Sequence, residues 1–358
     1  MKENDLITGG IDQILREIRT ILDSARGNVA HQINRELLNA YWNIGRIVCE
    51  YEQSLPDRAD YGKRTLKEIS KVLTKEFGKG FSVSNIQFMR RFYQNYSIQQ
   101  TLSAKLSWSH FCELLTISDP DKRRSYEKEA VNSNWSVREL KRQIESSLFE
   151  RLLLSHGEVT REQILALALH GNEISRPVDI IRDPYVFEFL GLPEDKSVME
   201  SDLERALVTQ IEKFLLELGR GFMFVGTQQR VTLNNTHYYV DMVFYNKILR
   251  AYVLIELKTT KLTPEAAGQI NMYLNYYAAE VNDPDDNPPI GIILCTEKDS
   301  VTAEYALGGL SNNIFASRYV LYMPNKDQLV RQVEAVLEKW HLETQLPGGN
   351  ADFSSVKH

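Results

Sequence analysis

Apolar residues recur at helical spacing through the first half of the chain. One such series is Ile14, Ile18, Ile21 and Leu22, and similar series continue to about residue 153. Because side chains three and four positions apart share one face of a helix, this pattern predicts an all-helical N-terminal domain over residues 1–154. Polar residues with proline and glycine breaks then predict a linker region over residues 155–200.

Two neighbouring helices of that half are expected to meet at Gly78 and Gly80. A capping box of Thr65 with Glu68 predicts the start of the first, and Ser84 is the expected cap of the second. The second helix leaves an outward face of basic and amide side chains, Gln87, Arg90, Arg91, Gln94 and Asn95. This arrangement fits a helix-turn-helix, and an ordinary αα-hairpin is the alternative.

The pattern changes after Ser201. A helix with apolar residues from Leu203 to Leu218, ended by Gly219, is followed by short runs rich in β-branched and aromatic residues. These runs predict strands over 222–225, 229–233, 238–245, 251–257 and 290–295, with a helix over 264–281 before the last strand. We therefore expect an α/β (α+β) domain with a mixed central sheet over residues 201–346. The tail, 347–358, is predicted to be disordered.

The composition favours a soluble, two-domain protein. The 358 residues are 43% hydrophobic and 25% charged, and no run approaches the roughly 20 apolar residues of a membrane span. The first residues, MKENDLITGG, lack the apolar core of a signal peptide, and the three cysteines show no paired metal-ligand spacing. We expect a cytoplasmic protein with no membrane partner, no disulfide framework and no cysteine-based zinc site.

Charge is distributed unevenly along the chain. The formal net charge is -6, yet residues 61–105 contain nine basic and only two acidic residues. A basic face of this kind binds phosphates or is merely solvated, and the charge alone does not separate the two. If it binds nucleic acid, the candidate contacts are Arg90, Arg91 and Lys79.

Three charged residues stand in otherwise core-like strands. Asp241 lies within YYVDMVFYN, while Glu256 and Lys258 are two positions apart in the next run and share one face of that strand. Such charges are costly to bury unless they are paired or bind a metal. Two carboxylates on neighbouring strands supply hard oxygen ligands for Mg²⁺, or for Mn²⁺, and a lysine can orient the attacking water. The alternative is that Glu256 and Lys258 are solvent-facing residues paired across the sheet.

These residues resemble the PD-(D/E)xK nuclease superfamily. The resemblance consists of Asp241, a hairpin, Glu256-Leu-Lys258, and then Gln269 and Tyr273 on the following helix. Wider similarity, in YWNIGR, DPYVFEFLGL, FLLELGRGFMFVG and GIILCTEK, is to the YhcG-like family, in which an all-helical domain precedes such a nuclease domain. The resemblance implies a restriction-endonuclease-like core and a metal-dependent nuclease.

The resemblance also implies further site residues. Glu204 matches the acidic residue expected on the helix before the sheet, with Glu212 as its rival, although Glu204 could instead close a capping box with Ser201. Gln269 and Tyr273 share a helix face, where they would assist catalysis or, for Tyr273, pack in the core. The superfamily's usual proline before the aspartate is replaced by Val240.

The resemblance implies hydrolysis of phosphodiester bonds in DNA. Cleavage inside a DNA strand is expected rather than removal of nucleotides from its ends. The expected biological role is in bacterial defence, repair or recombination. Two alternatives stay open: a non-catalytic nucleic-acid-binding or regulatory module on a nuclease-like scaffold, and an RNA-processing nuclease. DNA is the expected partner, and RNA, a second copy of the chain and a protein bound to the helical domain are the other candidates.

Overall fold

The computed structural model describes residues 2–53, 58–97, 105–155, 159–192, 198–297, 306–307 and 313–345. The chain forms two compact units, Met1–Ser118 and Asp119–His358. The division falls earlier than the junction predicted near residue 154, because the helices after Ser118 pack within the second unit. The tail predicted to be disordered, 347–358, lies outside the described residues.

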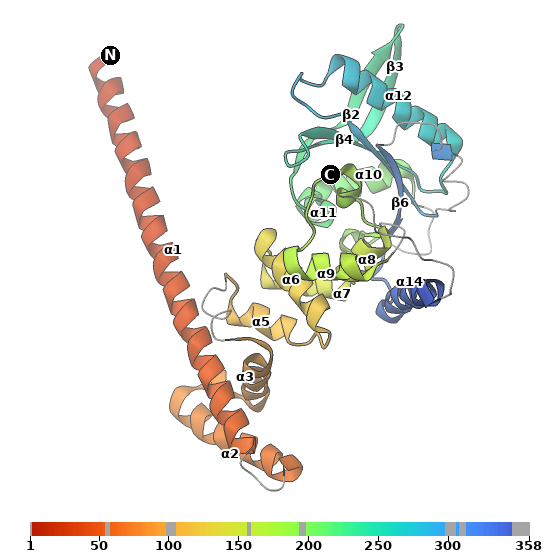
Figure 1. The fold of residues 1–358 in the computed structure, drawn as a ribbon. Coiled ribbons are helices and arrows are strands. Elements are labelled where there is room, and N and C mark those ends of the chain that lie inside the picture. The colour runs from red at the N-terminus through yellow and green to blue at the C-terminus, as the bar shows by residue number, and fades with distance from the viewer. Residues whose placement is uncertain are drawn as a thin grey trace, which may run out of the picture. The chain divides into compact units, whose positions relative to one another are not determined.

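Every described element of the first unit is helical (Figure 1). The elements are α1 Lys2–Gln53, α2 Arg58–Phe77, the 3-10 turn η1 Lys79–Phe81, α3 Val83–Asn95 and α5 Trp108–Leu114. Helix α3 packs on α1 at Gly45, where an added Cβ would lie 2.0 Å from the carbonyl oxygen of Met89. Only a residue without a side chain allows the two backbones to approach so closely.

Two capping predictions in this unit are wrong. Helix α2 already begins at Arg58, so Thr65 lies inside it. The cap of α3 is Ser82, whose extended backbone (φ -60, ψ 155) follows the 3-10 turn and whose side chain accepts from the Asn85 N–H. Ser84 therefore lies within the first helical turn. The predicted order of helix, glycine-containing turn and helix is nevertheless present.

The second unit opens with four helices, α6 Pro120–Asn132, α7 Val137–Glu145, α8 Leu148–Ser155 and α9 Arg161–His170. Ser136 caps α7 by accepting a hydrogen bond from the Glu139 N–H. Ser147 adopts a positive φ of 56° and separates α7 from α8. Among the described residues, no helix combines the length and apolar character that a membrane span needs.

A mixed, six-stranded sheet forms the centre of the second unit, in the order β1-β6-β5-β4-β3-β2. Its strands are β1 Tyr185–Val186, β2 Phe222–Leu233, β3 Thr236–Asn246, β4 Ala251–Leu257, β5 Ile290–Cys295 and β6 Ile314–Val320. Strands β4, β5, β6 and β1 are parallel, and β3 and β2 are antiparallel additions. This mixed sheet with flanking helices confirms the predicted restriction-endonuclease-like fold.

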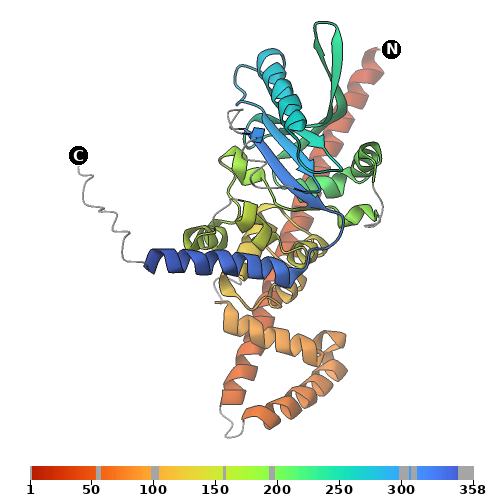
Figure 2. The ribbon, with the colours of Figure 1, turned by 90° about the vertical axis from the view of Figure 1, so that its right-hand side faces the viewer.

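Helices cover both faces of the sheet (Figure 2). Helices α10 Glu200–Thr209 and α11 Ile211–Leu218 pack on one face, α12 Pro264–Glu280 packs on the other, and α14 Lys326–Gln345 contacts α8. Val253 and Ile255 of β4 point to the α10–α11 core, whereas Leu254 points to the α12 core. The alternation expected for this strand is therefore correct.

Other boundaries differ from expectation. The two runs at 222–225 and 229–233 form one strand, β2, with a bulge between Phe224 and Gly226. The helix predicted from Leu203 to Leu218 is two helices, because Gln210 (φ -110, ψ 33) interrupts it. Gly219, with φ 107°, ends α11 as predicted. Strands β1 and β6 were not predicted.

A buried carboxylate on α11 gathers three arginines. Glu217 is fully buried and lies 3.1 Å from an Arg142 nitrogen, 2.5 Å from one of Arg151 and 3.6 Å from one of Arg182. Its Oε1 also accepts the backbone N–H of Val186 at 2.9 Å. Burial works to raise the pKa of Glu217, but the arginines outweigh it and lower that pKa to about 2.

Removing this charge should destabilise the protein. Glu217→Gln leaves buried guanidinium groups uncompensated, so we expect a loss of about 3–5 kcal/mol in the free energy of unfolding. Because the pKa is lowered from 4.5 to about 2, the loss should be full above pH 4.5 and shrink as pH falls toward 2. Denaturant unfolding followed by circular dichroism measures it.

The matched control is Glu212→Gln, since Glu212 is exposed on the same helix. It should change stability by less than about 0.5 kcal/mol. Equal effects of the two substitutions would show that the arginine cluster does not stabilise the fold.

Candidate active site

Asp241 and Glu256 face each other on β3 and β4. The ladder ends at the pair Met242 with Ile255, and one further step in the same register places Asp241 opposite Glu256. At this point the strands separate, and Asp241 Oδ2 accepts the backbone N–H of Leu257 at 2.8 Å. The carboxylate thus replaces a backbone acceptor, which holds it rigidly at the place where the sheet opens.

Glu256 is a buried carboxylate that is only half satisfied. It is 2% exposed, its Oε1 accepts from Lys258 Nζ at 3.0 Å, and its Oε2 is buried with no hydrogen-bond partner among the described residues. Burial first, and then the charge of Asp241, raises the pKa of Glu256 to about 7. Burial also raises the pKa of Asp241, against the Leu257 N–H and Lys258, which lower it. The pair therefore favours an added cation.

Lys258 lies just beyond the end of β4, with its ammonium between two carboxylates. Nζ is 3.0 Å from Glu256 Oε1 and 3.3 Å from Glu200 Oε2. Burial works to lower the pKa of Lys258, but Glu256 and Glu200 outweigh it and raise that pKa. Lys258 is thus held as a cation directly beside the carboxylate pair.

Glu204 reaches the pair through an amide. Gln228 Nε2 donates to Glu204 Oε2 at 2.8 Å and to Asp241 Oδ1 at 3.3 Å. Because α10 begins at Glu200 with Met199 as its N-cap and no side-chain cap, the capping-box interpretation of Ser201 with Glu204 is wrong. Burial raises the pKa of Glu204, and the charge of Asp241 adds to this. The rival, Glu212, lies exposed on α11.

Gln269 and Tyr273 form a structural link on α12. Gln269 Nε2 donates to the Tyr273 hydroxyl at 2.7 Å, and that hydroxyl donates to the backbone oxygen of Tyr239 at 3.0 Å. Tyr273 is 1% exposed and belongs to the core under α12. These hydrogen bonds connect α12 to β3 two residues before Asp241. Tyr273 therefore packs in the core, as the alternative interpretation expected. A catalytic role for Gln269 or Tyr273 stays a prediction.

Sequence reasoning missed Glu200 and Gln228. Glu200 stands in the first turn of α10 and also accepts weakly from the Thr259 N–H at 3.4 Å. Gln228 adopts a positive φ of 47°, which is strained for a side chain of this size and turns its amide toward Asp241. Neither residue carries a sequence signal, because both depend on where α10 and β2 meet the end of β4.

The donors fit one divalent cation that keeps part of its water shell. Among the described residues, no group of three or more His, Cys, Asp or Glu side chains is arranged to hold a metal. The predicted ligand set of Asp241, Glu256 and Glu204 stays a prediction, and Gln228 links Glu204 to Asp241 by hydrogen bonds to both. Mg²⁺ binds readily through one or two carboxylates with waters and substrate phosphate, and the unpartnered Glu256 Oε2 offers such a ligand.

The predicted nucleic-acid contacts of the first unit differ in their surroundings. Arg90 Nε forms an ion pair with Glu52 Oε2 at 2.8 Å, so the charge of Arg90 is largely neutralised within the protein. Arg91 on α3 and Lys79 in the 3-10 turn are exposed. These two are the better placed for a phosphate.

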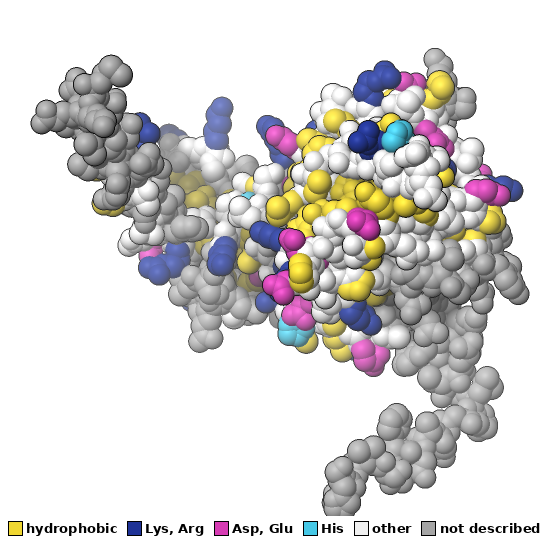
Figure 3. All heavy atoms as spheres, turned by 90° about the horizontal axis from the view of Figure 1, so that it is seen from above, with side chains coloured by type: hydrophobic (Ala, Val, Ile, Leu, Met, Phe, Trp, Pro, Cys, Tyr) yellow, Lys and Arg dark blue, Asp and Glu magenta, His cyan; other side chains and the backbone are white. Residues whose placement is uncertain are grey.

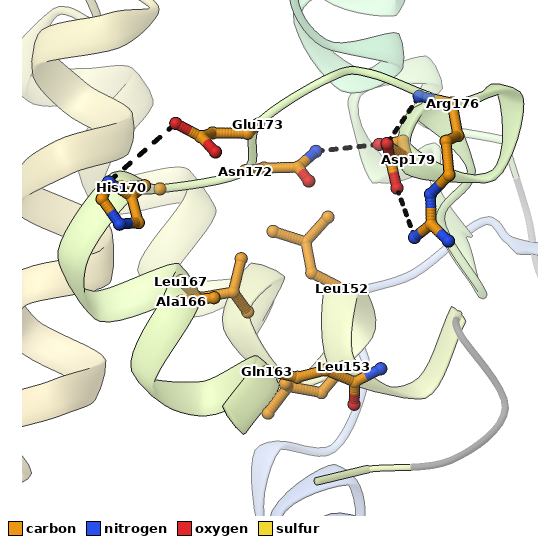
Figure 4. Close-up of a pocket in the computed structure, with 11 residues that line it drawn as sticks. Leu152, Leu153, Gln163, Ala166, Leu167, His170, Asn172, Glu173, Arg176 and Asp179 are labelled. Carbon is orange, nitrogen blue, oxygen red and sulfur yellow. Dashed lines mark hydrogen bonds and ion pairs between the residues drawn. The ribbon is translucent and has the colours of Figure 1, made fainter. Parts of the chain in front are cut away.

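A separate pocket lies between α8, α9 and the following loop (Figure 4). Its volume is about 160 Å³, and leucines and alanine line it together with His170, Asn172, Glu173, Arg176 and Asp179. Asp179 accepts from the Arg176 N–H at 2.7 Å and therefore closes the loop on itself. Neither Asp241 nor Glu256 lines this pocket.

Comparison with known proteins connects this geometry to a family. A family model described as the YhcG PDDEXK nuclease domain matches residues 178–334, and one described as the DUF1016 N-terminal domain matches residues 17–151. The chain is 38% identical to "Putative nuclease YhcG" of Escherichia coli (strain K12), over 93% of this chain and 96% of that protein. The second match ends near the predicted junction at 154 while the compact units divide at Ser118, so that junction stays a prediction.

Two solved structures resemble part of the chain. A repair endonuclease from Pyrococcus abyssi is 18% identical, with 37% of this chain and 50% of that chain covered and a TM-score of 0.25. The EndoMS–dsDNA2 complex is also 18% identical, with 37% and 49% covered and a TM-score of 0.26. The matched part spans about half of each of those chains.

The raised pKa of Glu256 predicts a pH-dependent stability of the metal-free protein. A carboxyl group whose pKa rises from 4.5 to about 7 destabilises the fold increasingly as pH rises through that interval. The Glu256→Gln variant should therefore be more stable than the unmodified protein at pH 8, with a free energy of unfolding about 1–3 kcal/mol higher. At pH 4.5 the two free energies of unfolding should be equal. Denaturant unfolding in a chelating buffer measures the difference. A variant that is less stable at pH 8 would contradict the prediction.

Proposed function

Because the chain belongs to the YhcG family, whose C-terminal domain is a nuclease of the PDDEXK type, we propose that it hydrolyses phosphodiester bonds in DNA with a divalent metal ion. The observation that carries this proposal is the buried, unpartnered Oε2 of Glu256 opposite Asp241 and beside Lys258. A scaffold without catalytic chemistry has no reason to keep a carboxylate in this state, since an unsatisfied buried charge is destabilising.

Asp241 and Glu256 would hold the metal, Mg²⁺ or its substitute Mn²⁺. When bound, the ion lowers the pKa of a coordinated water and neutralises charge on the phosphate oxygens. The Leu257 N–H keeps Asp241 aimed at the site, and the β4–β5 ladder keeps the backbone of Glu256 in place. Both residues are therefore held by their strands, which is the kind of preorganisation that catalysis requires.

Lys258 would position the attacking water and stabilise charge on the phosphate. Its pKa is raised, so it is protonated throughout the neutral pH range. Its two carboxylate partners lie on different elements, Glu256 at the end of β4 and Glu200 at the start of α10. These contacts fix the ammonium next to the metal ligands. Glu204 would act on Asp241 through Gln228 and bind water or metal from the α10 side.

We propose that the protein cuts DNA strands internally, not at their ends. The basic segment of the first unit, residues 61–105, would add affinity for DNA. A covalently closed plasmid has no ends, so its conversion to nicked or linear DNA tests internal cleavage directly. RNA of matched sequence tests the substrate class. Purified protein should cut the plasmid only when Mg²⁺ or Mn²⁺ is present.

Substitutions at the site should separate binding from cutting. Asp241→Asn and Glu256→Gln each remove a metal ligand and should abolish metal-dependent cleavage. In metal-free buffer their DNA affinity should equal or exceed that of the unmodified protein, because a charge that repels phosphate is gone. Lys258→Met should also stop cleavage but weaken binding slightly, since it removes a cation. Plasmid cleavage and fluorescence anisotropy measure the two effects.

The control is Glu212→Gln, which removes an exposed carboxylate from the same domain and should leave cleavage unchanged. If the three site variants cut DNA as the unmodified protein does, the nuclease assignment is wrong. If no form of the protein cuts any substrate while DNA binding persists, the chain is a nucleic-acid-binding module on a nuclease scaffold.

The first unit should contribute affinity mainly through Arg91. Arg91→Ala should weaken DNA binding and reduce the salt dependence of log Kd by about one unit of slope, as expected for one lost phosphate contact. Arg90→Ala should change the slope less, because Arg90 is already paired with Glu52. Anisotropy titrations over a range of salt concentrations compare the two. Identical behaviour of both variants and the unmodified protein would assign the basic face to solvation or to a protein partner.

A further inference from the structure

Strands β2 and β3 extend beyond the rest of the sheet. Strand β4 pairs with β3 only from Met242 to Asn246, whereas the β2–β3 ladder continues to Leu233 paired with Thr236. We call residues 229–240 the ribbon. Figure 1 shows it projecting beyond α12. A two-stranded ribbon is marginally stable by itself, so its persistence needs an anchor.

The base of the ribbon is anchored firmly. Val231 and Val240 are fully buried in the core under α12, and the Tyr273 hydroxyl donates to the backbone oxygen of Tyr239 at 3.0 Å. At the tip, Asn234 and Asn235 both have positive φ, as a tight two-residue hairpin turn requires. The ribbon is therefore a defined arm with a fixed direction.

The chemistry of the arm differs from that of the chain as a whole. The chain contains 48 Asp and Glu residues, yet none lies between Phe222 and Val240. From Arg230 to Tyr239 every residue except Val231 is exposed. The exposed side chains are a guanidinium, an imidazole, hydroxyls, amides, phenols and the apolar side chain of Leu233. Such a surface does not repel a polyanion and presents many hydrogen-bond donors.

One face of the ribbon carries the guanidinium, the imidazole, one hydroxyl and one phenol. The ladder pairs Arg230 with Tyr239 and Thr232 with His237, and paired residues share a face. The Thr232 hydroxyl lies 3.0 Å from His237 Nδ1, which orients the ring. The opposite face carries the anchoring valines. Figure 3 views the molecule from above and shows how basic, acidic, hydrophobic and uncharged side chains are distributed over that face.

The ribbon adjoins the proposed metal site at both ends. Gln228 directly precedes it and Asp241 directly follows it, and these two residues contact each other at 3.3 Å. A nucleic acid held along the ribbon would consequently pass close to the carboxylates. The arm thus couples the place of binding to the place of cutting.

We propose that the ribbon enters the major groove of duplex DNA with the face of Arg230, Thr232, His237 and Tyr239 toward the bases. This inference rests on the proposed nuclease function and specifies its substrate. The major groove of B-DNA, about 12 Å wide, admits a two-stranded ribbon, whereas the major groove of duplex RNA is too deep and narrow for side chains to read. Phosphates line the edges of the groove, and the ribbon carries no carboxylate that would repel them.

The test uses the full chain in chelating buffer, where no cutting occurs, with fluorescent duplex DNA, the single strand and duplex RNA of the same sequence. Arg230→Ala with His237→Ala should weaken duplex-DNA binding about tenfold and leave the weaker binding of the other two nucleic acids nearly unchanged. The matched control is Lys247→Ala, which removes an exposed cation just beyond the opposite end of β3. It should change duplex binding less than twofold. Thermal melting confirms that both variants fold.

A second measurement distinguishes failure of the ribbon inference from failure of the proposed function. With Mg²⁺, the ribbon variant should raise the KM for duplex cleavage and leave kcat within about twofold, because it does not touch the metal ligands. If the unmodified protein cuts nothing while the ribbon variant still loses duplex affinity, the proposed function fails and the ribbon inference stands. Unchanged duplex affinity overturns the inference even if cleavage is normal.

Two further results would also overturn it. Equal losses for single strands and duplex would make the ribbon a stacking platform for single-stranded nucleic acid. Because β2 is an edge strand, a second copy of the chain could pair with it instead. Sedimentation of the unmodified protein and the ribbon variant tests this, and a dimer lost in the variant would assign the arm to self-association.

Discussion

The buried Glu217 is the interaction on which the arrangement of the second unit depends. It lies on α11 beneath the sheet, and its partners come from α7, α8 and the segment that leads into β1. A single carboxylate thus fixes the helices after Ser118 against the edge strand and the α11 layer. Removing any partner would leave a charge unbalanced in the interior, so these elements form one unit. These contacts agree with the placement of α7 and α8 in the second unit.

The same physics with the opposite balance distinguishes the candidate active site. Three arginines outweigh the effect of burial on Glu217 and lower its pKa to about 2, whereas burial and Asp241 raise the pKa of Glu256 to about 7, since one lysine does not compensate for them. The negative charge of Glu217 is balanced by groups of the protein, whereas that of Glu256 is not. Strongly perturbed groups of the second kind are typical of functional sites. The contrast supports a cation as the missing partner of Asp241 and Glu256.

Local sequence patterns predicted the strands that carry the candidate site residues. The bounds of β4 and β5 agree with expectation because each is a continuous apolar run limited by breaks, and the alternation along β4 correctly placed Glu256 apart from Val253 and Ile255. The predictions failed where local signals were weak or duplicated. Strand β1 has only two residues, and Thr65 and Ser84 have the residue types of helix caps while lying inside helices.

The order of amino acids alone predicted the fold class and singled out Asp241, Glu256 and Lys258 as candidate site residues, because periodicity and strand context depend on neighbours in the chain. Tertiary structure decides the rest. Gln228 joins Glu204 to Asp241, and Glu200 holds Lys258, only because α10 and β2 converge at the end of β4. The break at Gln210 and the arginines around Glu217 likewise depend on packing between distant segments. Contacts of this kind have no period along the chain, since they arise from the distances that folding creates.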